Sequence, residues 1–277
     1  MLIKDFLFNL KSQLKNSLKK KHYFKFFTKI ISNSFKYIIF SLRKFFSIKN
    51  IDQIKLDDNI KSLDDIFIWF DCDKSSKVHG YHKFYENIFS NFLNLEPKIL
   101  EFGIHHGASQ ASFYKYLPKA NIIGVDKNPY TKKFYSNNIR SLYCDFSDKD
   151  SIGYLKSYIN GKFDIIIDDA SHIPIHQLNT FCEMFEVLNN NGVYIIEELD
   201  IFQSFKEYYN KNLKTEKSLI REFLYDFKIN DINYLNDKYQ FHNANTIIHS
   251  IKKIDILRGD YIVNGNNVSE IALIFKK

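Results

Sequence analysis

Two apolar runs near the middle of the chain each end abruptly at a pair of acidic residues. Residues 163–172 read Phe-Asp-Ile-Ile-Ile-Asp-Asp-Ala-Ser-His, and residues 193–200 read Val-Tyr-Ile-Ile-Glu-Glu-Leu-Asp. A continuous run rich in Ile and Val is typical of a strand that is buried on both faces. Because removing acid pairs from water is costly, their position at the ends of two such strands indicates a functional role.

Alternating strand and helix patterns continue from residue 98 to the C-terminus. They predict strands at 98–104, 121–126, 141–144, 163–168 and 192–197, with two more near 246–248 and 271–275. Helical patterns fall at 107–117, 173–188 and 203–227. This β-α-β-α order predicts an α/β fold built on a doubly wound, Rossmann-like sheet of seven mostly parallel strands.

The first 50 residues follow a helical pattern instead. Their apolar residues recur every three to four positions, at Ile3, Leu7, Leu10, Leu14 and Leu18, and the pattern resumes over 24–42. One interpretation is a helix that lies on an anionic membrane surface. The favoured one is a helical arm that packs on the body or on a second subunit of a homo-oligomer. The predicted organisation is an arm at 1–50, a linker and lid or helical segment at 51–97, and a catalytic domain at 98–277.

The charge of the chain is unevenly distributed. The formal net charge is +7, but residues 1–50 hold twelve Lys or Arg and one acid, whereas the remainder holds 27 basic and 31 acidic residues. A mildly acidic body argues against a nucleic-acid-binding surface there. Three scattered cysteines without a C-x-x-C motif indicate buried thiols in a reducing compartment, and no apolar stretch of the arm approaches a membrane span. The expected location is therefore the cytoplasm.

The loop after the first predicted strand carries the pattern of a nucleotide site. It reads Glu101-Phe-Gly103-Ile-His105-His-Gly107. Ligands of such sheets bind at the carboxyl ends of the strands, near the point where the strand order reverses. Gly103 lets the chain turn sharply beside a ligand, and the following helix offers its N-terminal N–H groups. Of the two loop histidines, His105 is the candidate for a contact with the cofactor.

Two acids at the next strand ends extend this site. Asp126 ends the second strand and is placed to accept hydrogen bonds from both ribose hydroxyls, and Asp145 closes the third strand, where an adenine would lie. The loop lacks the G-x-G-x-x-G pattern of dinucleotide sites and reads E-x-G-x-x-x-G. An acid at Glu101 suits a cationic nucleoside better than an anionic dinucleotide. S-adenosylmethionine is such a ligand.

At these residues the chain resembles the class I S-adenosylmethionine-dependent methyltransferases. More narrowly, it resembles the metal-dependent sugar O-methyltransferases, a group that includes the macrolide-sugar 2-O-methyltransferases. The narrow resemblance covers roughly residues 70–200. It rests on the stretches DKSSKVHGYHKFYE (73–86), ILEFGIHHGASQ (99–110), IIIDDASH (165–172) and YIIEEL (194–199).

The resemblance implies Asp169, Glu197 and Glu198 as ligands of Mg²⁺ (or Mn²⁺) and His172 as the base. The family usually has Asp where this chain has Glu198. Three carboxylates suit a hard cation rather than zinc, and such a cation lowers the pKa of a sugar hydroxyl so that a neutral imidazole can take its proton. Asp168 is expected to face away from Asp169 and to bind the cofactor or support the loop.

A simpler interpretation of the first acid pair also exists. Ser171 or Asp169 could merely cap the following helix, with His172 at the surface. A cap would not explain the second acid pair on another strand, so the functional interpretation is favoured.

An aromatic and polar cluster precedes the first strand of the sheet. It consists of His79, Tyr81, His82 and Tyr85. The resemblance implies that this segment folds over the cofactor or the acceptor as a lid, and the alternative is a helix with two buried tyrosines.

Three functions remain in competition. The favoured one is O-methylation of a sugar hydroxyl in a cell-surface polysaccharide or glycoconjugate, with a nucleotide sugar or a finished glycan as acceptor. The second is methylation of nucleic acid through the basic arm, which a carboxylate-lined site disfavours because phosphates would be repelled. The third is a non-catalytic cofactor-binding scaffold, which the intact acid pairs disfavour.

Overall fold

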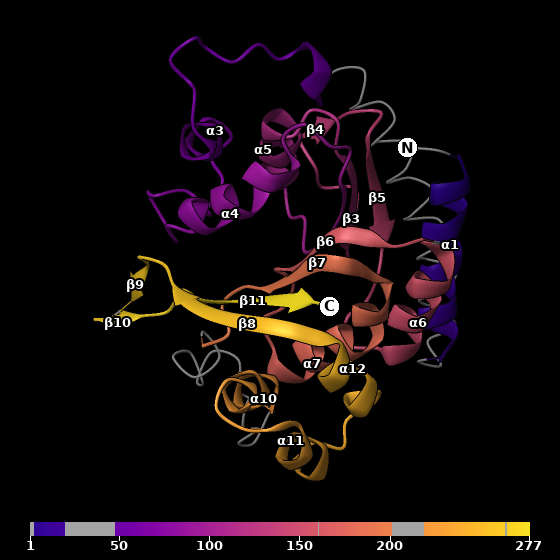
Figure 1. The fold of residues 1–277 in the computed structure, drawn as a ribbon. Helices are drawn as coiled ribbons and strands as arrows, with labels where there is room; N and C mark the ends of the chain where they lie inside the picture. The colour runs from indigo at the N-terminus through magenta and orange to yellow at the C-terminus, as the bar shows by residue number, and fades with distance from the viewer. Residues whose placement is uncertain (1–2, 20–47, 160, 201–218, 264) are drawn as a thin grey trace.

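The computed structural model describes residues 3–19, 48–159, 161–200, 219–263 and 265–277. Its centre is a seven-stranded sheet with the order β5-β3-β2-β6-β7-β11-β8 (Figure 1). The strands are β2 (Lys98–Phe102), β3 (Asn121–Asp126), β5 (Ile139–Tyr143), β6 (Phe163–Asp168), β7 (Leu188–Ile196), β8 (Ile251–Arg258) and β11 (Glu270–Lys276). The first five run parallel, and β11 pairs antiparallel with both β7 and β8. The prediction of a seven-stranded, mostly parallel sheet is confirmed.

Two buried clusters cover the two faces of this sheet. One packs α3 (Leu63–Trp69), α4 (His82–Phe89) and α5 (Ala108–Tyr116) on one face. The other packs α6 (Lys149–Tyr158), α7 (Pro174–Met184), α10 (Leu219–Phe227), α11 (Ile232–Lys238) and α12 (Ala244–Ser250) on the opposite face. Neighbouring residues of β2 join different clusters, Ile99 the first and Leu100 the second. The continuous apolar runs of the sequence therefore reflect burial on both faces.

The smaller elements lie outside this sheet. They are β1 (Lys49–Asn50), β4 (Phe134–Tyr135), β9 (Ile262–Val263), β10 (Asn266–Asn267) and the 3-10 turns η1 (Ile51–Gln53), η2 (Ser90–Phe92) and η3 (Phe185–Val187). The strands pair as β1 with β4 and β9 with β10. Two residues are too few to show a strand period, so the sequence pattern did not predict these pairs.

One predicted strand is wrong. Residues 246–248 lie in α12, and the strand begins only at Ile251. The run Thr-Ile-Ile suggested a strand because β-branched residues favour one. The buried positions Ala244, Ile247 and Ile248 instead follow the three-to-four spacing of a helix face, and packing on the sheet overrides the local preference.

Helix α1 (Ile3–Lys19) packs along the edge strand β5 and beside α6 (Figure 1). The amide of Asn9 donates to the carbonyl of Ser141 (3.2 Å) and accepts from the N–H of Tyr143 (2.8 Å). The buried carboxylate of Asp5 accepts from the Arg140 guanidinium at 3.1 and 2.6 Å. The first helix of the arm is thus part of the body, in line with the favoured interpretation, because its polar side chains complete an otherwise unpaired strand edge.

The face that α1 buries differs from the predicted one. Leu7 of the apolar stripe is 46% exposed, and Leu10 and Leu14 are half-buried, whereas Asn9 and Asn16 are buried. A strand edge offers backbone donors and acceptors, which polar side chains satisfy and leucines do not. The arm pattern at 24–42 and the predicted helical residues 203–218 lie outside the described residues.

Phe8 is the main apolar anchor of α1. Its ring stacks on Tyr158 (centroids 3.9 Å apart) and on Tyr154 (5.1 Å), and it is 3% exposed. We expect Phe8→Ala to lower the free energy of unfolding by about 3–4 kcal/mol, because it leaves a cavity between the two rings. Urea denaturation measures this, with the exposed Leu7→Ala as the matched control, expected within about 0.5 kcal/mol of the wild type. Equal effects of the two substitutions would mean that α1 is not docked as described.

Two further expectations from the sequence concern membranes and cysteines. Among the described residues, no helix combines the length and the apolar character needed to cross a bilayer. Cys72, Cys144 and Cys182 are all buried free thiols, as the sequence predicted. Homo-oligomerisation and contact with a membrane surface stay predictions.

Candidate active site

The loops that end β2 and β6 touch one another. The N–H of Asp169 donates to the carbonyl of Phe102 at 2.9 Å. Gly103 has φ +84°, and a Cβ added there would lie 1.9 Å from the carbonyl oxygen of Asp169. A side chain at this position would collide with backbone, so the glycine is required. This contact joins the predicted nucleotide loop directly to the first acid pair.

Two adjoining cavities lie at the carboxyl ends of the strands. A larger one of about 670 Å³ reaches from Asp126 and His105 to Lys74, Asp169 and His172. A smaller one of about 280 Å³ is lined by Asp126, Asp145, Phe146 and Ser147. Both are bounded by Gly103, Asp126 and Ala170. An elongated ligand centred on Asp126 would therefore extend toward Asp145 at one end and toward the acid cluster at the other.

Asp126 and Asp145, which are predicted to bind the ribose and the adenine of the cofactor, also stabilise the loops that carry them. One oxygen of Asp126 accepts from the N–H groups of Ile104 (3.0 Å) and His105 (3.2 Å), and the other accepts from Asn128 N–H (2.7 Å). Asp145 accepts from Asn16 Nδ2 of α1 at 3.0 Å. Asn16 could not be predicted from the sequence, because nothing in the arm's pattern links it to a strand end 129 residues away.

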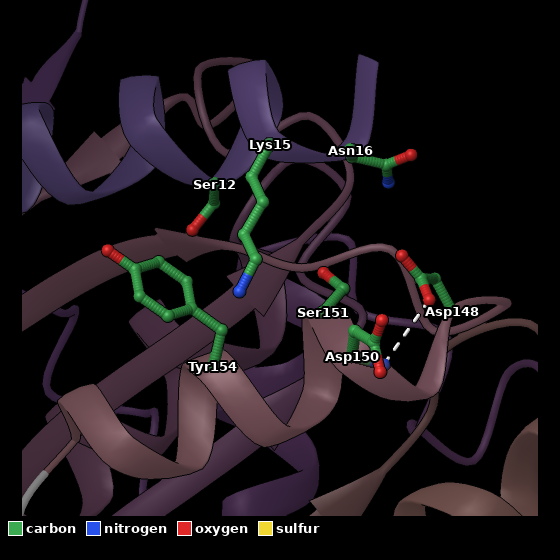
Figure 2. A pocket seen from close by; sticks show the side chains of 7 residues that line it. All are labelled: Ser12, Lys15, Asn16, Asp148, Asp150, Ser151 and Tyr154. Atoms are coloured by element: carbon green, nitrogen blue, oxygen red, sulfur yellow. Dashed lines mark hydrogen bonds between the residues drawn. The ribbon is translucent and has the colours of Figure 1, made fainter. Parts of the chain in front are cut away.

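Helix α1 also borders a third cavity, of about 340 Å³ (Figure 2). Figure 2 shows Ser12, Lys15 and Asn16 on one side of it and the start of α6 on the other. There Asp148 caps α6 by accepting from the N–H of Asp150. The helical arm therefore contacts the adenine end of the predicted cofactor site as well as the strand edge.

Glu101 and Asp168 lie buried behind the cavities rather than in their walls. Burial raises the pKa of each carboxyl to about 8. For Glu101, nearby Lys74 and Ser109 oppose that rise, and neither carboxylate oxygen has a well-oriented hydrogen-bond partner among the described residues. Gly107, with φ +80°, is the residue preceding α5 and lines neither cavity. Of the predicted cofactor residues, Gly103, His105, Asp126 and Asp145 come together in the walls.

The raised pKa of Glu101 gives a test of its burial. The folded protein holds this proton up to about pH 8, whereas the unfolded chain loses it near its ordinary value of 4.5. Folded-state stability therefore falls as pH rises from about 4.5 to 8. Glu101→Gln cannot titrate, so we expect its melting temperature to rise relative to wild type as pH increases from 5 to 8. Asp168 changes the melting temperatures of both proteins with pH in the same way, so its contribution cancels in the comparison. A difference in melting temperature between variant and wild type that does not change with pH would contradict the raised pKa of Glu101.

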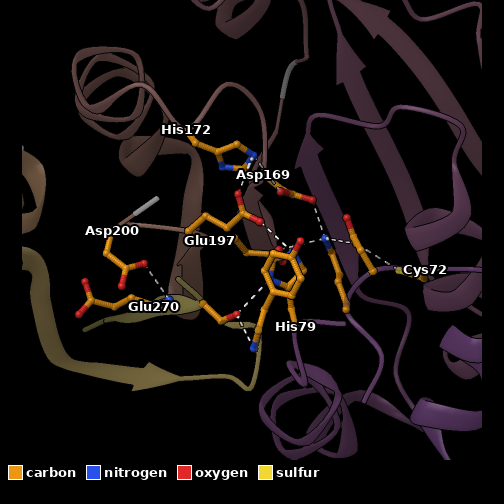
Figure 3. A network of polar contacts seen from close by, with 12 residues as sticks. Cys72, His79, Asp169, His172, Glu197, Asp200 and Glu270 are labelled. Carbon is orange, nitrogen blue, oxygen red and sulfur yellow. Dashed lines mark hydrogen bonds and ion pairs between the residues drawn. The ribbon is translucent and has the colours of Figure 1, made fainter. Parts of the chain in front are cut away.

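Asp169, which follows β6, meets Glu197 and Glu198, which follow β7, in one polar network (Figure 3). Lys74 Nζ lies 2.5 Å from Asp169 Oδ2 and 3.0 Å from Glu197 Oε2. The Tyr85 hydroxyl donates to the other oxygen of Glu197. Burial raises the pKa of Glu197 and of Asp169, and Lys74 acts against that rise. The pairing of β6 with β7 brings the two strand ends together, as predicted, and Lys74, which was not predicted from the sequence, contacts both.

Glu198 holds two histidines. Its Oε1 lies 3.0 Å from His79 Nε2 and its Oε2 lies 3.2 Å from His172 Nε2, which is also 3.7 Å from Asp169 Oδ1. Burial alone would raise the pKa of Glu198, but the His79 hydrogen bond and the two imidazoles lower it. His172 (φ +52°) and Glu198 (φ +54°) both adopt left-handed backbone. Such strained conformations in non-glycine residues concentrate at functional sites.

The predicted lid residues divide into two groups. His79, Tyr81 and Tyr85 lie at the acid network, with the rings of His79 and Tyr81 stacked 5.1 Å apart and both tyrosines fully buried. His82 does not join it, because its Nδ1 lies 3.6 Å from Asp64. In a helix, successive residues point in different directions, so His82 leaves the face that Tyr81 and Tyr85 share.

The capping interpretation of the first acid pair is wrong. Helix α7 begins after Ile173 with Pro174, and no side chain caps it. The Ser171 hydroxyl contacts His176 Nδ1 at 2.9 Å instead, and Asp169 faces Lys74. The carboxylate therefore serves the network rather than the helix end.

A second network fixes the loop after β7 (Figure 3). Asp200 accepts from the N–H of Glu270 (3.1 Å) and pairs with Arg258 (2.8 Å). Buried Glu270 also binds Arg258 (3.0 Å) and Arg221 (2.5 Å). This sets the chain direction immediately after Glu198. The sequence showed Asp200 as part of an acidic run, but its partners lie on β8 and β11 and left no local signal.

The carboxylates fit a hard divalent cation by donor type but not in their present arrangement. Asp169, Glu197 and Glu198 supply oxygen donors at adjacent strand ends, as Mg²⁺ prefers. Two of them contact the Lys74 ammonium and the third contacts two imidazoles. Within the described ranges, no three acidic, His or Cys side chains form a cluster ready to hold a metal. The Lys74 ammonium already stands between two of these carboxylates, where a cation would be attracted.

Known proteins similar to this chain are sugar O-methyltransferases. It is 32% identical over 136 residues to the 8-demethyl-8-(2-methoxy-alpha-L-rhamnosyl)-tetracenomycin-C 3'-O-methyltransferase of Streptomyces olivaceus, covering 46% of this chain and 34% of that protein. It is 28% identical over 131 residues to the mycinamicin VI 2''-O-methyltransferase of Micromonospora griseorubida, covering 44% and 32%. The chain thus spans about a third of the length of these relatives. No profile of a known protein family matches it.

Solved structures confirm the fold. The methyltransferase MycE of the mycinamycin biosynthetic pathway, in complex with Mg, SAH and mycinamycin VI, superimposes with a TM-score of 0.59 at 19% identity. The match covers 79% of this chain and 55% of MycE. The chain therefore shares the Rossmann-like fold of this methyltransferase. Its resemblance to sugar O-methyltransferases is confirmed by the relatives named above.

Proposed function

We propose that this chain transfers the methyl group of S-adenosylmethionine to a hydroxyl of a sugar-bearing acceptor, with the help of a divalent cation. The observation that supports this proposal most is the larger cavity. It is lined by Asp126, the predicted ribose ligand, at one end and by Asp169 and His172 at the other. A cofactor with its adenosine toward Asp145 would direct its methionine half at the acid network. The similarity to sugar O-methyltransferases supports the acceptor class.

His172 is the proposed proton acceptor. Its Nε2 lies 3.2 Å from Glu198 Oε2 and 3.7 Å from Asp169 Oδ1, on the side of the proposed metal ligands, whereas its Nδ1 is buried. A sugar hydroxyl bound beside these carboxylates would give its proton to Nε2 of the neutral imidazole. In the reaction the sugar O–H bond breaks as the new O–CH₃ bond forms. The S–CH₃ bond of the sulfonium breaks with its electron pair staying on sulfur, which yields S-adenosylhomocysteine, and the proton passes to His172.

Asp169, Glu197 and Glu198 are the residues that would hold Mg²⁺ or Mn²⁺. When bound, such an ion lowers the pKa of an alcohol and fixes its orientation. Tyr85 positions Glu197 and His79 positions Glu198, so each would present a fixed oxygen. This division assigns a positioning role to Tyr85 and His79.

The acceptor is proposed only as a sugar-bearing molecule. The similar proteins act, by their names, on a rhamnosylated tetracenomycin and on mycinamicin VI. They give no support to the predicted role in polysaccharide biosynthesis, which stays a prediction from sequence.

Calorimetric titration of the full chain tests the cofactor assignment. We expect S-adenosylhomocysteine to bind with one site per chain and NADH not to bind, because the loop lacks the glycines that cradle a pyrophosphate. Absence of S-adenosylhomocysteine binding, or preference for NADH, would contradict the proposed function.

A further inference from the structure

Lys74 is a buried cation inside the proposed metal cage. Its side chain is 1% exposed, and its ammonium contacts Asp169 and Glu197, one carboxylate from each strand end. Its carbonyl accepts from the N–H of His82 at the start of α4 (2.9 Å), which fixes the lysine backbone against this helix. Contacts of this kind make Lys74 a built part of the site rather than a passing surface side chain.

The charge of the site shows why a cation is needed there. Asp169, Glu197 and Glu198 lie together in a buried network, and uncompensated buried carboxylates are strongly destabilising. The imidazoles around Glu198 carry charge only when protonated. Among the described residues, Lys74 is the one lysine or arginine that pairs with any of these three carboxylates. The lysine thus supplies the positive charge that a metal ion would otherwise bring.

We propose that Lys74 is a built-in counter-cation, which holds Asp169 and Glu197 in place before a metal arrives and which a divalent cation must displace from them. This rests on the proposed function, because it takes the three carboxylates as the metal ligands. Asp73 offers the displaced ammonium a second partner: its carboxylate lies 3.7 Å from Lys74 Nζ and its side chain is 61% exposed. The lysine then sets how tightly metal binds, since each metal-binding event breaks its two ion pairs.

Metal affinity is the direct test. Mg²⁺ is titrated by calorimetry into full-length wild type, Lys74→Met and Lys83→Met. Lys83 is a matched control, because it lies in α4 but pairs with Asp260 at the surface. We expect Lys74→Met to bind Mg²⁺ about tenfold more tightly or better, since a close competing charge is removed. On changing from Mg²⁺ to EDTA, the melting temperature of Lys74→Met is expected to fall far more than that of wild type, because the variant then has no cation beside its carboxylates. Lys83→Met should match wild type in both.

Unchanged or weaker Mg²⁺ binding by Lys74→Met, or no binding by any variant, would overturn the proposal. Lys74→Arg covers the case in which the methionine variant fails to fold in either buffer. Arginine keeps the positive charge and forms stronger hydrogen bonds with two carboxylates, so we expect Lys74→Arg to bind Mg²⁺ more weakly than wild type. Equal Mg²⁺ binding by Lys74→Arg and wild type would contradict the proposed role of Lys74. Titration of S-adenosylhomocysteine into wild type is scored separately. Its failure would sink the cofactor assignment without bearing on the metal comparison.

Discussion

Replacing His172 with alanine should lower the turnover number by about a hundred- to ten-thousand-fold, the usual contribution of a general base. Among the described residues, His172 is the one imidazole that contacts both Asp169 and Glu198. It does not lie on the adenosine side of the cavities, so the affinity for S-adenosylhomocysteine should stay within about twofold of wild type, far below the tenfold that 1.4 kcal/mol represents. Steady-state kinetics and calorimetry measure the two effects.

His242→Ala is the matched control for this substitution. Its imidazole is 60% exposed and lies 3.5 Å from Glu183, and neither residue lines the two cavities. We expect it to keep full turnover. Retention of wild-type turnover by His172→Ala would remove this residue from the reaction, and a loss of turnover together with cofactor binding would indicate a structural role instead.

Glu198→Gln should have the second-largest effect, a loss of turnover of about a hundredfold or more. The carboxylate both orients His172 and belongs to the proposed cage, and a neutral amide can do neither equally well. The same variant should weaken Mg²⁺ binding, because a charged ligand is lost. Turnover assays over a range of Mg²⁺ concentrations measure both.

Glu198→Asp keeps the carboxylate charge but shortens the side chain, so it tests whether the length of Glu198 matters for turnover. The family that the chain resembles usually has Asp here, but the glutamate now bridges His79 and His172 at 3.0 and 3.2 Å. The shorter side chain should lose one of these contacts, so we expect turnover between that of wild type and Glu198→Gln. Glu186→Gln, which removes an exposed partner of Lys156, serves as control and should be unaffected. Wild-type turnover in Glu198→Gln would exclude this carboxylate from the reaction.

The sequence predicted the parts of the site that follow from strand burial. Apolar runs mark β2, β6 and β7, and parallel strands place their carboxyl ends at one edge of the sheet, so Asp169 and Glu197 had to come close. Gly103 and Asp126 followed from the same rule. These predictions needed a local pattern and one topological principle, and both were present in the chain.

The side chains that contact the carboxylates of the site from other parts of the chain follow no pattern in the sequence. Lys74 and Asn16 reach strand ends 95 and 129 residues away, and only the folded chain shows that they do. The α1 contact was misjudged for a related reason. Its leucine stripe is visible in the sequence, but the strand edge it meets requires polar partners such as Asn9. Local propensity likewise failed for 246–248, where packing on the sheet decided for a helix.

The most direct test is transfer of a labelled methyl group from S-adenosylmethionine to a panel of rhamnosylated macrolide and tetracenomycin acceptors, followed by mass spectrometry. The full chain should add one methyl to a sugar hydroxyl, lose this activity in EDTA and regain it with Mg²⁺. Methylation that persists undiminished in EDTA would contradict the metal assignment. Cofactor binding without transfer to any sugar in the panel would contradict the proposed acceptor class.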